Sequence, residues 1–123
     1  MSILRLAHRW AGGLIGLFLS ILGLSGAMLV HKDDWLRLTT PHAAEAQMQD
    51  TATLAAAVQR IFEDPDPPRS IVLASKRLGL HRLSYIDKER GAYADQTGEI
   101  VAQWSSKWER PEIWLFDLHH YLL

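Results

Sequence analysis

The chain has 123 residues, a net charge of -1 at pH 7 and no cysteine. Without cysteine it cannot form disulfides, thiolate zinc sites, iron–sulfur clusters or the C-x-x-C-H attachment of c-type haem, so histidine or carboxylate would have to hold a metal or haem. The nearly balanced charge argues against nucleic acid as a partner. Neither a Walker A sequence nor a G-x-G-x-x-G between a strand and a helix is present, so nothing in the sequence supports nucleotide binding.

The first predicted element is a membrane-spanning helix, because Trp10 to Val30 contains no charged residue. As a helix this run would reach about 31 Å, close to the roughly 30 Å hydrocarbon thickness of a bilayer. A cleaved secretory signal is the alternative, since Ser25-Gly26-Ala27 offers small residues for cleavage. The apolar run exceeds the usual signal core of about 7 to 15 residues, which favours a permanent anchor in the lipid bilayer.

Orientation depends on the flanking charges. Arg5 and Arg9 before the run are balanced by Lys32 and Arg37 after it, so the Lys/Arg count shows no excess. The charged α-amino group and the short N-terminal flank favour the N-terminus in the cytoplasm. We therefore expect residues 32–111 to lie outside the cytoplasmic membrane.

After the membrane run, Asp33 to Ala46 is interpreted as a connector with one helical turn, and Trp35 suits the interfacial belt. A second helix is predicted from Asp50 or Thr51 to the proline-rich segment Asp64 to Pro68. Its apolar residues recur at helical spacing. They are Leu54, Ala55, Val58, Ile61 and Phe62.

Short strands are predicted next, because β-branched and aromatic residues alternate with charged or glycine-containing breaks. The predicted strands are residues 70–75, 80–86, 91–93 and 99–104. A turn at Asp95-Gln96-Thr97-Gly98 precedes the last of them. One amphipathic helix followed by an antiparallel meander predicts a small α+β domain with the helix on the sheet.

The final stretch, Ile113 to Leu123, is apolar but too short to cross a bilayer. One interpretation is an interfacial helix. The favoured one is the start of a second membrane helix, with Leu123 as a truncation point in a longer protein. The predicted division is therefore a cytoplasmic N-terminus (1–9), a membrane helix (10–31), an outer domain (32–111) and the start of a second membrane helix (112–123).

The predicted membrane helix carries a stripe of small residues. Gly12, Gly16, Ser20, Gly23 and Ala27 follow one another at spacings of three or four positions. Small residues at this spacing let another helix approach closely, so packing against further helices or partner subunits is the plain interpretation. The alternative is a shallow groove that admits the flat face of a porphyrin.

The chain resembles the N-terminal part of the PepSY-associated transmembrane family, which includes iron-regulated membrane proteins and ferric-siderophore reductases. Leu6 to Gly12 and Leu22 to Val30 are similar to the family's first helix, and Asp95 to Ile100 resembles its PepSY segment. Phe116 to Leu123 looks like the family's entry into the second membrane helix. The resemblance implies a bacterial inner-membrane protein with a periplasmic PepSY-like domain, of which this chain is a fragment.

Four histidines stand near the predicted membrane boundaries, namely His8, His31, His119 and His120. The resemblance to haem-bearing reductases implies that such histidines ligate haem b, which needs axial ligands from facing helices and no cysteine. If the two helices are antiparallel, His31 and either His119 or His120 lie at the same leaflet. The plain alternative is that these side chains simply tolerate the polar interface.

Adjacent helical residues point about 100° apart, so only one of His119 and His120 can face a given cofactor. Asp117, three positions before His120, could accept its other ring proton. His42 and His81 are interpreted as ordinary surface residues.

Two functions follow from these observations. The first is part of a haem-dependent inner-membrane reductase in ferric-siderophore uptake. The second is a non-enzymatic, membrane-anchored PepSY module that binds or restrains a partner protein or peptide, as PepSY segments do in protease propeptides. The sequence shows no grouped nucleophile and base and no H-E-x-x-H, so hydrolytic catalysis lacks support.

Overall fold

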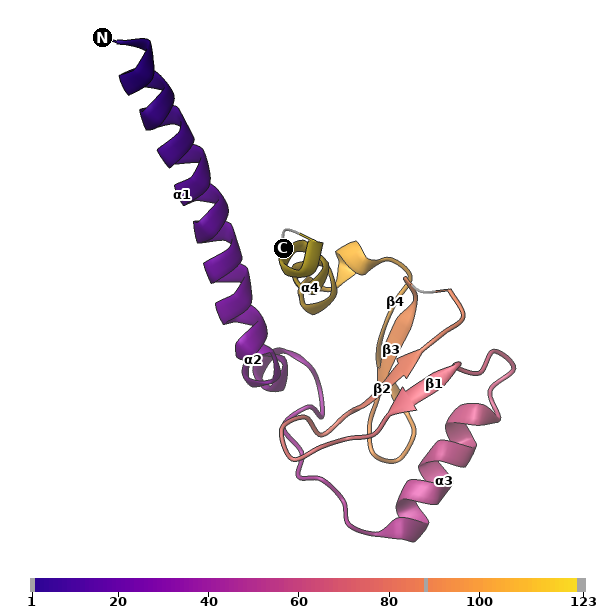
Figure 1. Cartoon of the computed structure of the whole chain (residues 1–123). Helices are drawn as coiled ribbons and strands as arrows, with labels where there is room; N and C mark the ends of the chain where they lie inside the picture. Colours follow the sequence, from indigo (N-terminus) through magenta and orange to yellow (C-terminus); the bar gives the residue numbers. More distant parts are fainter. Residues whose placement is uncertain (1, 88, 122–123) are drawn as a thin grey trace.

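The structure is a computed structural model that describes residues 2–87 and 89–121. A long N-terminal helix, α1, projects from an α+β domain, and the last helix, α4, lies between α1 and the sheet (Figure 1). The fold predicted from the sequence, a membrane helix followed by a helix on an antiparallel sheet, is confirmed.

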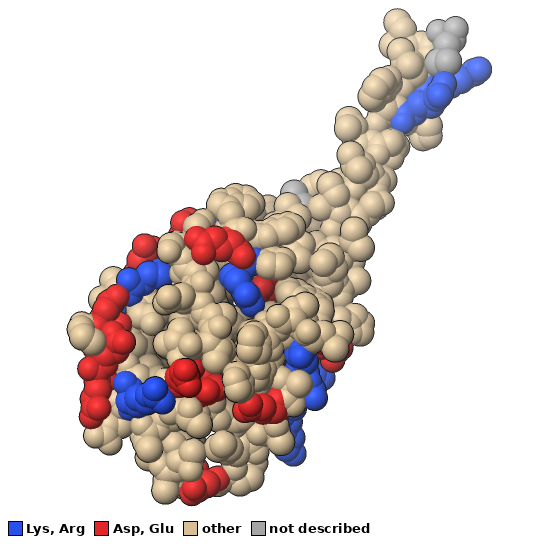
Figure 2. All heavy atoms as spheres, turned by 180° about the vertical axis from the view of Figure 1, so that it is seen from behind, with Lys and Arg blue, Asp and Glu red and all other residues tan. Residues whose placement is uncertain are grey.

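Helix α1 spans Ile3–Val30, so it begins before the charge-free run and includes Arg5, His8 and Arg9. The Ser2 hydroxyl accepts a hydrogen bond from the Arg5 backbone N–H at 3.4 Å and caps the first turn. In the described part of the chain, α1 is the one helix long and apolar enough to cross a membrane. Figure 2 shows it as a stem without charged groups between a basic tip and a domain of mixed charge.

The chain bends at His31 into a second helix, α2 (Lys32–Thr39). The prediction of a connector with one helical turn was therefore wrong, because two turns form. Their stability comes from packing: Leu36 is buried, and Trp35 packs against the same core cluster. The indole N–H of Trp35 also donates to the Met28 carbonyl at 2.9 Å, which ties α2 to the last turn of α1.

Helix α3 (Thr51–Phe62) begins as predicted at Asp50, whose carboxylate accepts from the Ala52 backbone N–H at 3.1 Å. It buries Ala57 and Ile61, whereas Phe62 is exposed.

The four strands form one antiparallel sheet in the order β1-β2-β3-β4. They span Ser70–Val72, His81–Ser84, Gly91–Ala94 and Ile100–Trp104. The predicted turn between β3 and β4 is confirmed: the Asp95 carboxylate accepts from the backbone N–H groups of Thr97 (2.9 Å) and Glu99 (3.1 Å). Gly98 adopts a φ of 93°, which favours glycine.

Both faces of the sheet are covered by helices, but by different ones. On one face Ile61 of α3 packs against Leu83, Ala92 and Ala94. On the other face Tyr93 and Trp104 join a second buried cluster with Leu36 of α2, Ala43 and Leu80, and Ile113 of α4 packs against it. The second cluster therefore connects the sheet to the helices that lie closest to α1.

After a short 3-10 helix, η1 (Lys107–Glu109), the chain enters α4 (Pro111–Tyr121), which packs against α1. Figure 1 views α4 nearly along its axis while α1 runs across the picture, so α4 crosses α1, and these residues do not form the antiparallel pair considered from the sequence. At about 1.5 Å per residue α4 is too short to span a bilayer. Leu122 and Leu123 lie outside the described residues, and a continuation into a second membrane helix stays a prediction.

Candidate functional site

The candidate site is the crossing of α1 and α4. Within the apolar run of α1, the least exposed residues are Leu22, Ser25, Gly26 and Leu29, and their spacing places them on one helical face. His119 of α4 lies against this face. A Cβ atom added at Gly26 would come within 2.9 Å of the His119 ring, so glycine is what allows the imidazole to approach the helix backbone.

Ser25 fixes the ring of His119. The Ser25 hydroxyl lies 3.2 Å from the Leu22 carbonyl, to which it donates, and 3.1 Å from Nδ1 of His119. The hydroxyl has one proton, which goes either to the carbonyl or to Nδ1 of His119. In the first arrangement Nδ1 of His119 carries the proton and donates to the Ser25 oxygen. Nε2 then carries a free lone pair. A histidine whose Nδ1–H is engaged presents Nε2 as a metal ligand.

The other predicted histidines are not brought to this crossing. His31 is exposed and its Nδ1 lies 3.2 Å from the carboxylate of Asp34. His120 is exposed and stacks on Phe116 at a ring separation of 5.7 Å. His8 is exposed near the other end of α1, about 34 Å along the helix from His31.

Asp117 has a different neighbour from the one expected. Its carboxylate lies 3.4 Å from the ammonium group of Lys107 in η1. No hydrogen bond joins Asp117 to His120 among residues 2–87 and 89–121. Instead, Ser25 is the side chain that forms a hydrogen bond with a histidine of α4, namely His119. The sequence had suggested only a cleavage site at Ser25.

The predicted stripe of small residues lies on a different face of α1 from Ser25. A Cβ atom added at Gly12, Gly16 or Gly23 would meet no described atom within 4 Å, and Ala27 is exposed. The Ser20 hydroxyl donates to the Gly16 carbonyl at 2.8 Å within α1. The stripe is therefore available to a helix other than α4.

A buried polar network holds α4 in place. The carboxylate of Glu112 is 3% exposed and accepts from Arg110 Nε at 2.8 Å and from the Tyr93 hydroxyl at 3.1 Å. Arg110 also donates to the Thr40 hydroxyl at 3.4 Å. Burial, reinforced by the charge of Glu112, holds the pKa of Tyr93 far above its ordinary value. Tyr93 therefore keeps its proton and remains a donor to Glu112.

His81 was expected at the surface, but it is 2% exposed. Its Nδ1 accepts from the Ala74 backbone N–H at 2.9 Å, and its Nε2 is buried with no partner in the described part of the chain. The side chain lines a cavity of about 60 Å³ beside Gln47 and Gln96. The prediction was wrong because alternation along β2 places His81 on the same buried face as Leu83.

We expect His81 to make the folded protein less stable at acidic pH. Burial lowers the pKa of His81 below its ordinary value of 6.5 in the folded protein. At a pH between the lowered pKa and the ordinary one, His81 is protonated more often in the unfolded chain than in the folded protein. The free energy of unfolding should then fall as the pH decreases below about 6.5. Urea titrations of the chain in detergent from pH 8 to pH 5 measure this slope. His81→Gln should flatten it, and an unchanged slope in that variant would contradict the assignment.

No group of three or more His, Cys, Asp or Glu side chains that could hold a metal ion occurs within the described residues. Metal binding at the α1–α4 crossing would therefore depend on His119 with ligands from elsewhere.

Comparison with known proteins gives one family. The family model for the PepSY-associated TM region matches residues 5–123, which is nearly the whole chain. No curated protein and no solved structure matches the chain.

Proposed function

The chain belongs to the PepSY-associated transmembrane family, and from this premise we propose that it is part of a haem b-dependent membrane reductase in ferric-siderophore uptake. The observation that supports this most directly is the Ser25–His119 pair at 3.1 Å, because His119 with its proton on Nδ1 would offer Nε2 to haem iron. Bound haem iron would supply one-electron transfer within the membrane.

The residues of the crossing would supply one ligand to haem iron but do not build a complete haem pocket. None of the three cavities described for the domain is lined by His31, His119 or His120. The second ligand and the opposite wall would come from further membrane helices, which the unoccupied stripe around Gly16 is suited to contact. His31 and His8, at the two ends of α1, are the remaining candidates on this chain.

The test is an optical spectrum of the purified full-length protein from haem-replete cells, before and after dithionite. We expect a Soret band that His119→Ala abolishes, whereas His120→Ala leaves it intact because His120 is exposed and stacks on Phe116. His31→Ala tests the alternative ligand. Ser25→Ala should keep haem but weaken its retention about 10- to 100-fold, as expected when a partner of a ligating histidine is removed.

Haem-free full-length protein would contradict the reductase proposal. The better account would then be a PepSY module that binds a partner protein or peptide at the membrane.

We also propose that α1 resides in a bacterial inner membrane with residues 32–111 in the periplasm. The basic tip of α1, Arg5 and Arg9, together with the N-terminal amine supports the cytoplasmic placement of that end. Alkaline phosphatase fused after the exposed Gln49 should be active, whereas β-galactosidase fused at the same residue should be inactive. The reverse pattern would overturn the orientation.

A further inference from the structure

A second site lies in the α+β domain, away from the α1–α4 crossing. It is a cleft of about 450 Å³ lined by β1, β2 and the start of α4. This volume falls within the range of about 300 to 1,000 Å³ that is typical of small-molecule sites.

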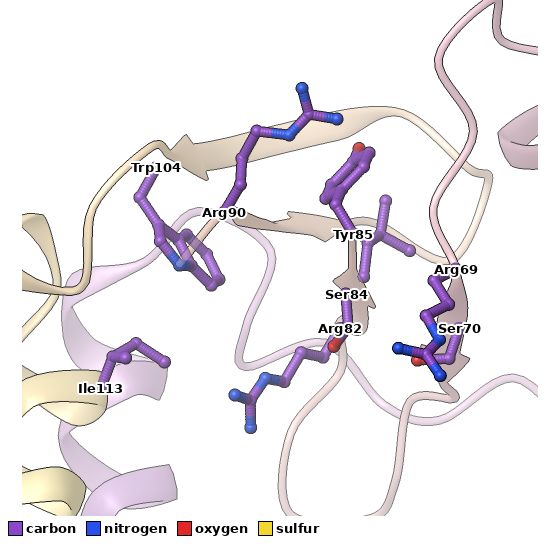
Figure 3. A pocket seen from close by; sticks show the side chains of 9 residues that line it. Arg69, Ser70, Arg82, Ser84, Tyr85, Arg90, Trp104 and Ile113 are labelled. Atoms are coloured by element: carbon purple, nitrogen blue, oxygen red, sulfur yellow. The ribbon is translucent and has the colours of Figure 1, made fainter. Parts of the chain in front are cut away.

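The strand register gathers donors on one face of the sheet. Ser70 of β1 pairs with Ser84 of β2, and Val72 pairs with Arg82, so the two serines and Arg82 share that face. Arg69, which precedes β1, donates its backbone N–H to the Ser84 carbonyl at 2.7 Å. Figure 3 shows the Arg69 guanidinium beside the Ser70 hydroxyl, and the Arg82 side chain extending from below Ser84 in the opposite direction, toward Ile113.

These donors have no acceptor of their own. Among the described residues, neither Arg69 nor Arg82 forms an ion pair, and no side-chain hydrogen bond uses the Ser70 or Ser84 hydroxyl. No lining residue is acidic. The third arginine of the lining, Arg90, is already paired with Asp66 and stacks on Tyr85 at 4.1 Å, and its guanidinium points away from the other two.

The other end of the cleft is apolar. The indole of Trp104 and the side chain of Ile113 form this wall (Figure 3). A ligand that fills the cleft would therefore place anionic oxygens along the row of Arg69, the two serines and Arg82, and an apolar part against Trp104 and Ile113.

We propose that this cleft binds an oxyanion, a carboxylate or a phosphate carried by a larger molecule, through Arg69, Arg82 and the two serine hydroxyls. Planar guanidinium groups bind such oxygens with two parallel hydrogen bonds, and hydroxyl donors complete the shell. The proposal does not depend on haem binding, so the two can fail separately. The anion has two possible sources, a small molecule in solution or the phosphate of a lipid headgroup.

One experiment distinguishes these sources. Calorimetric titration of the full chain in phosphatidylcholine nanodiscs, with citrate and with inorganic phosphate, measures binding of soluble anions. Mass spectrometry of the chain extracted from membranes counts the phosphatidylglycerol that remains bound. We expect saturable binding in one of the two measurements, weakened about 10-fold or more by Arg82→Gln and by Arg69→Gln, because each removes a charge-assisted donor.

Arg77→Gln is the matched control, because Arg77 is exposed and lies outside the cleft. Arg82→Lys keeps the charge but loses the planar fork, and we expect it to bind more weakly than the wild type and better than Arg82→Gln. Circular dichroism shows whether each variant is folded. Absence of binding in both measurements, or an equal loss in Arg77→Gln, would overturn the proposal.

Discussion

Replacing Arg110 with methionine should destabilise the domain by about 3–5 kcal/mol, the usual cost of leaving a buried charge without its partner. Arg110 donates to Glu112 at 2.8 Å, and Glu112 is 3% exposed. The same guanidinium lies 5.4 Å from the Tyr93 ring centre and 5.7 Å from that of Trp104. Its loss therefore removes a charge partner and two aromatic contacts at once. Urea unfolding of the chain in detergent, followed by tryptophan fluorescence, measures the change.

A double substitution separates the charge effect from packing. Adding Glu112→Gln to Arg110→Met removes the unpaired carboxylate and keeps an acceptor for the Tyr93 hydroxyl, so part of the lost stability should return. Lys107→Met is the matched control, because the Lys107–Asp117 pair is partly exposed. Such pairs contribute about 0.2–1 kcal/mol. A loss in Arg110→Met no larger than in Lys107→Met would contradict the importance of the buried network.

Local signals in the sequence were sufficient for most of the elements. The charge-free run predicted α1, Asp50 predicted the start of α3, and the Asp95 to Gly98 segment predicted the turn between β3 and β4. Each of these depends on neighbours within a few residues. Helix α2 was largely missed because its two turns are stabilised by Leu36 and Trp35 packing on residues distant in sequence, such as Tyr93 and Trp104.

The site was only partly predictable for the same reason. His119 was a candidate from the sequence, but its partner Ser25 is 94 positions away and meets it only because α4 crosses α1. That crossing is held by Glu112 and Arg110, whose charges resemble those of any solvated helix start. The cleft that contains Arg69 and Arg82 could not be predicted either, because it depends on the register of β1 and β2, which places Ser70 beside Ser84.

The α1–α4 crossing predicts opposite results for two glycines of the same helix. Gly26→Leu should displace His119, because a Cβ alone would lie 2.9 Å from the ring that Ser25 holds. A Cβ added at Gly16 meets no described atom within 4 Å, so Gly16→Leu should leave the crossing unchanged. For association of α1 with another membrane helix we expect the reverse. Gly16→Leu should weaken it by about 1–3 kcal/mol, since Gly16 lies at the centre of the stripe predicted to pack on such a helix.

The chain has no cysteine, so nitroxide labels can be attached at two introduced cysteines without altering native thiols. Leu14 on α1 and Tyr121 on α4 are suitable because they are 62% and 80% exposed. Pulsed electron resonance should give one narrow distance distribution for the otherwise unchanged chain and for Gly16→Leu, and a shifted or broadened one for Gly26→Leu. A narrow distribution that survives Gly26→Leu would mean that the contacts of α4 with the domain, including the Arg110–Glu112 network and Ile113, are sufficient to hold it. The close approach of His119 to α1 would then not be required for the crossing.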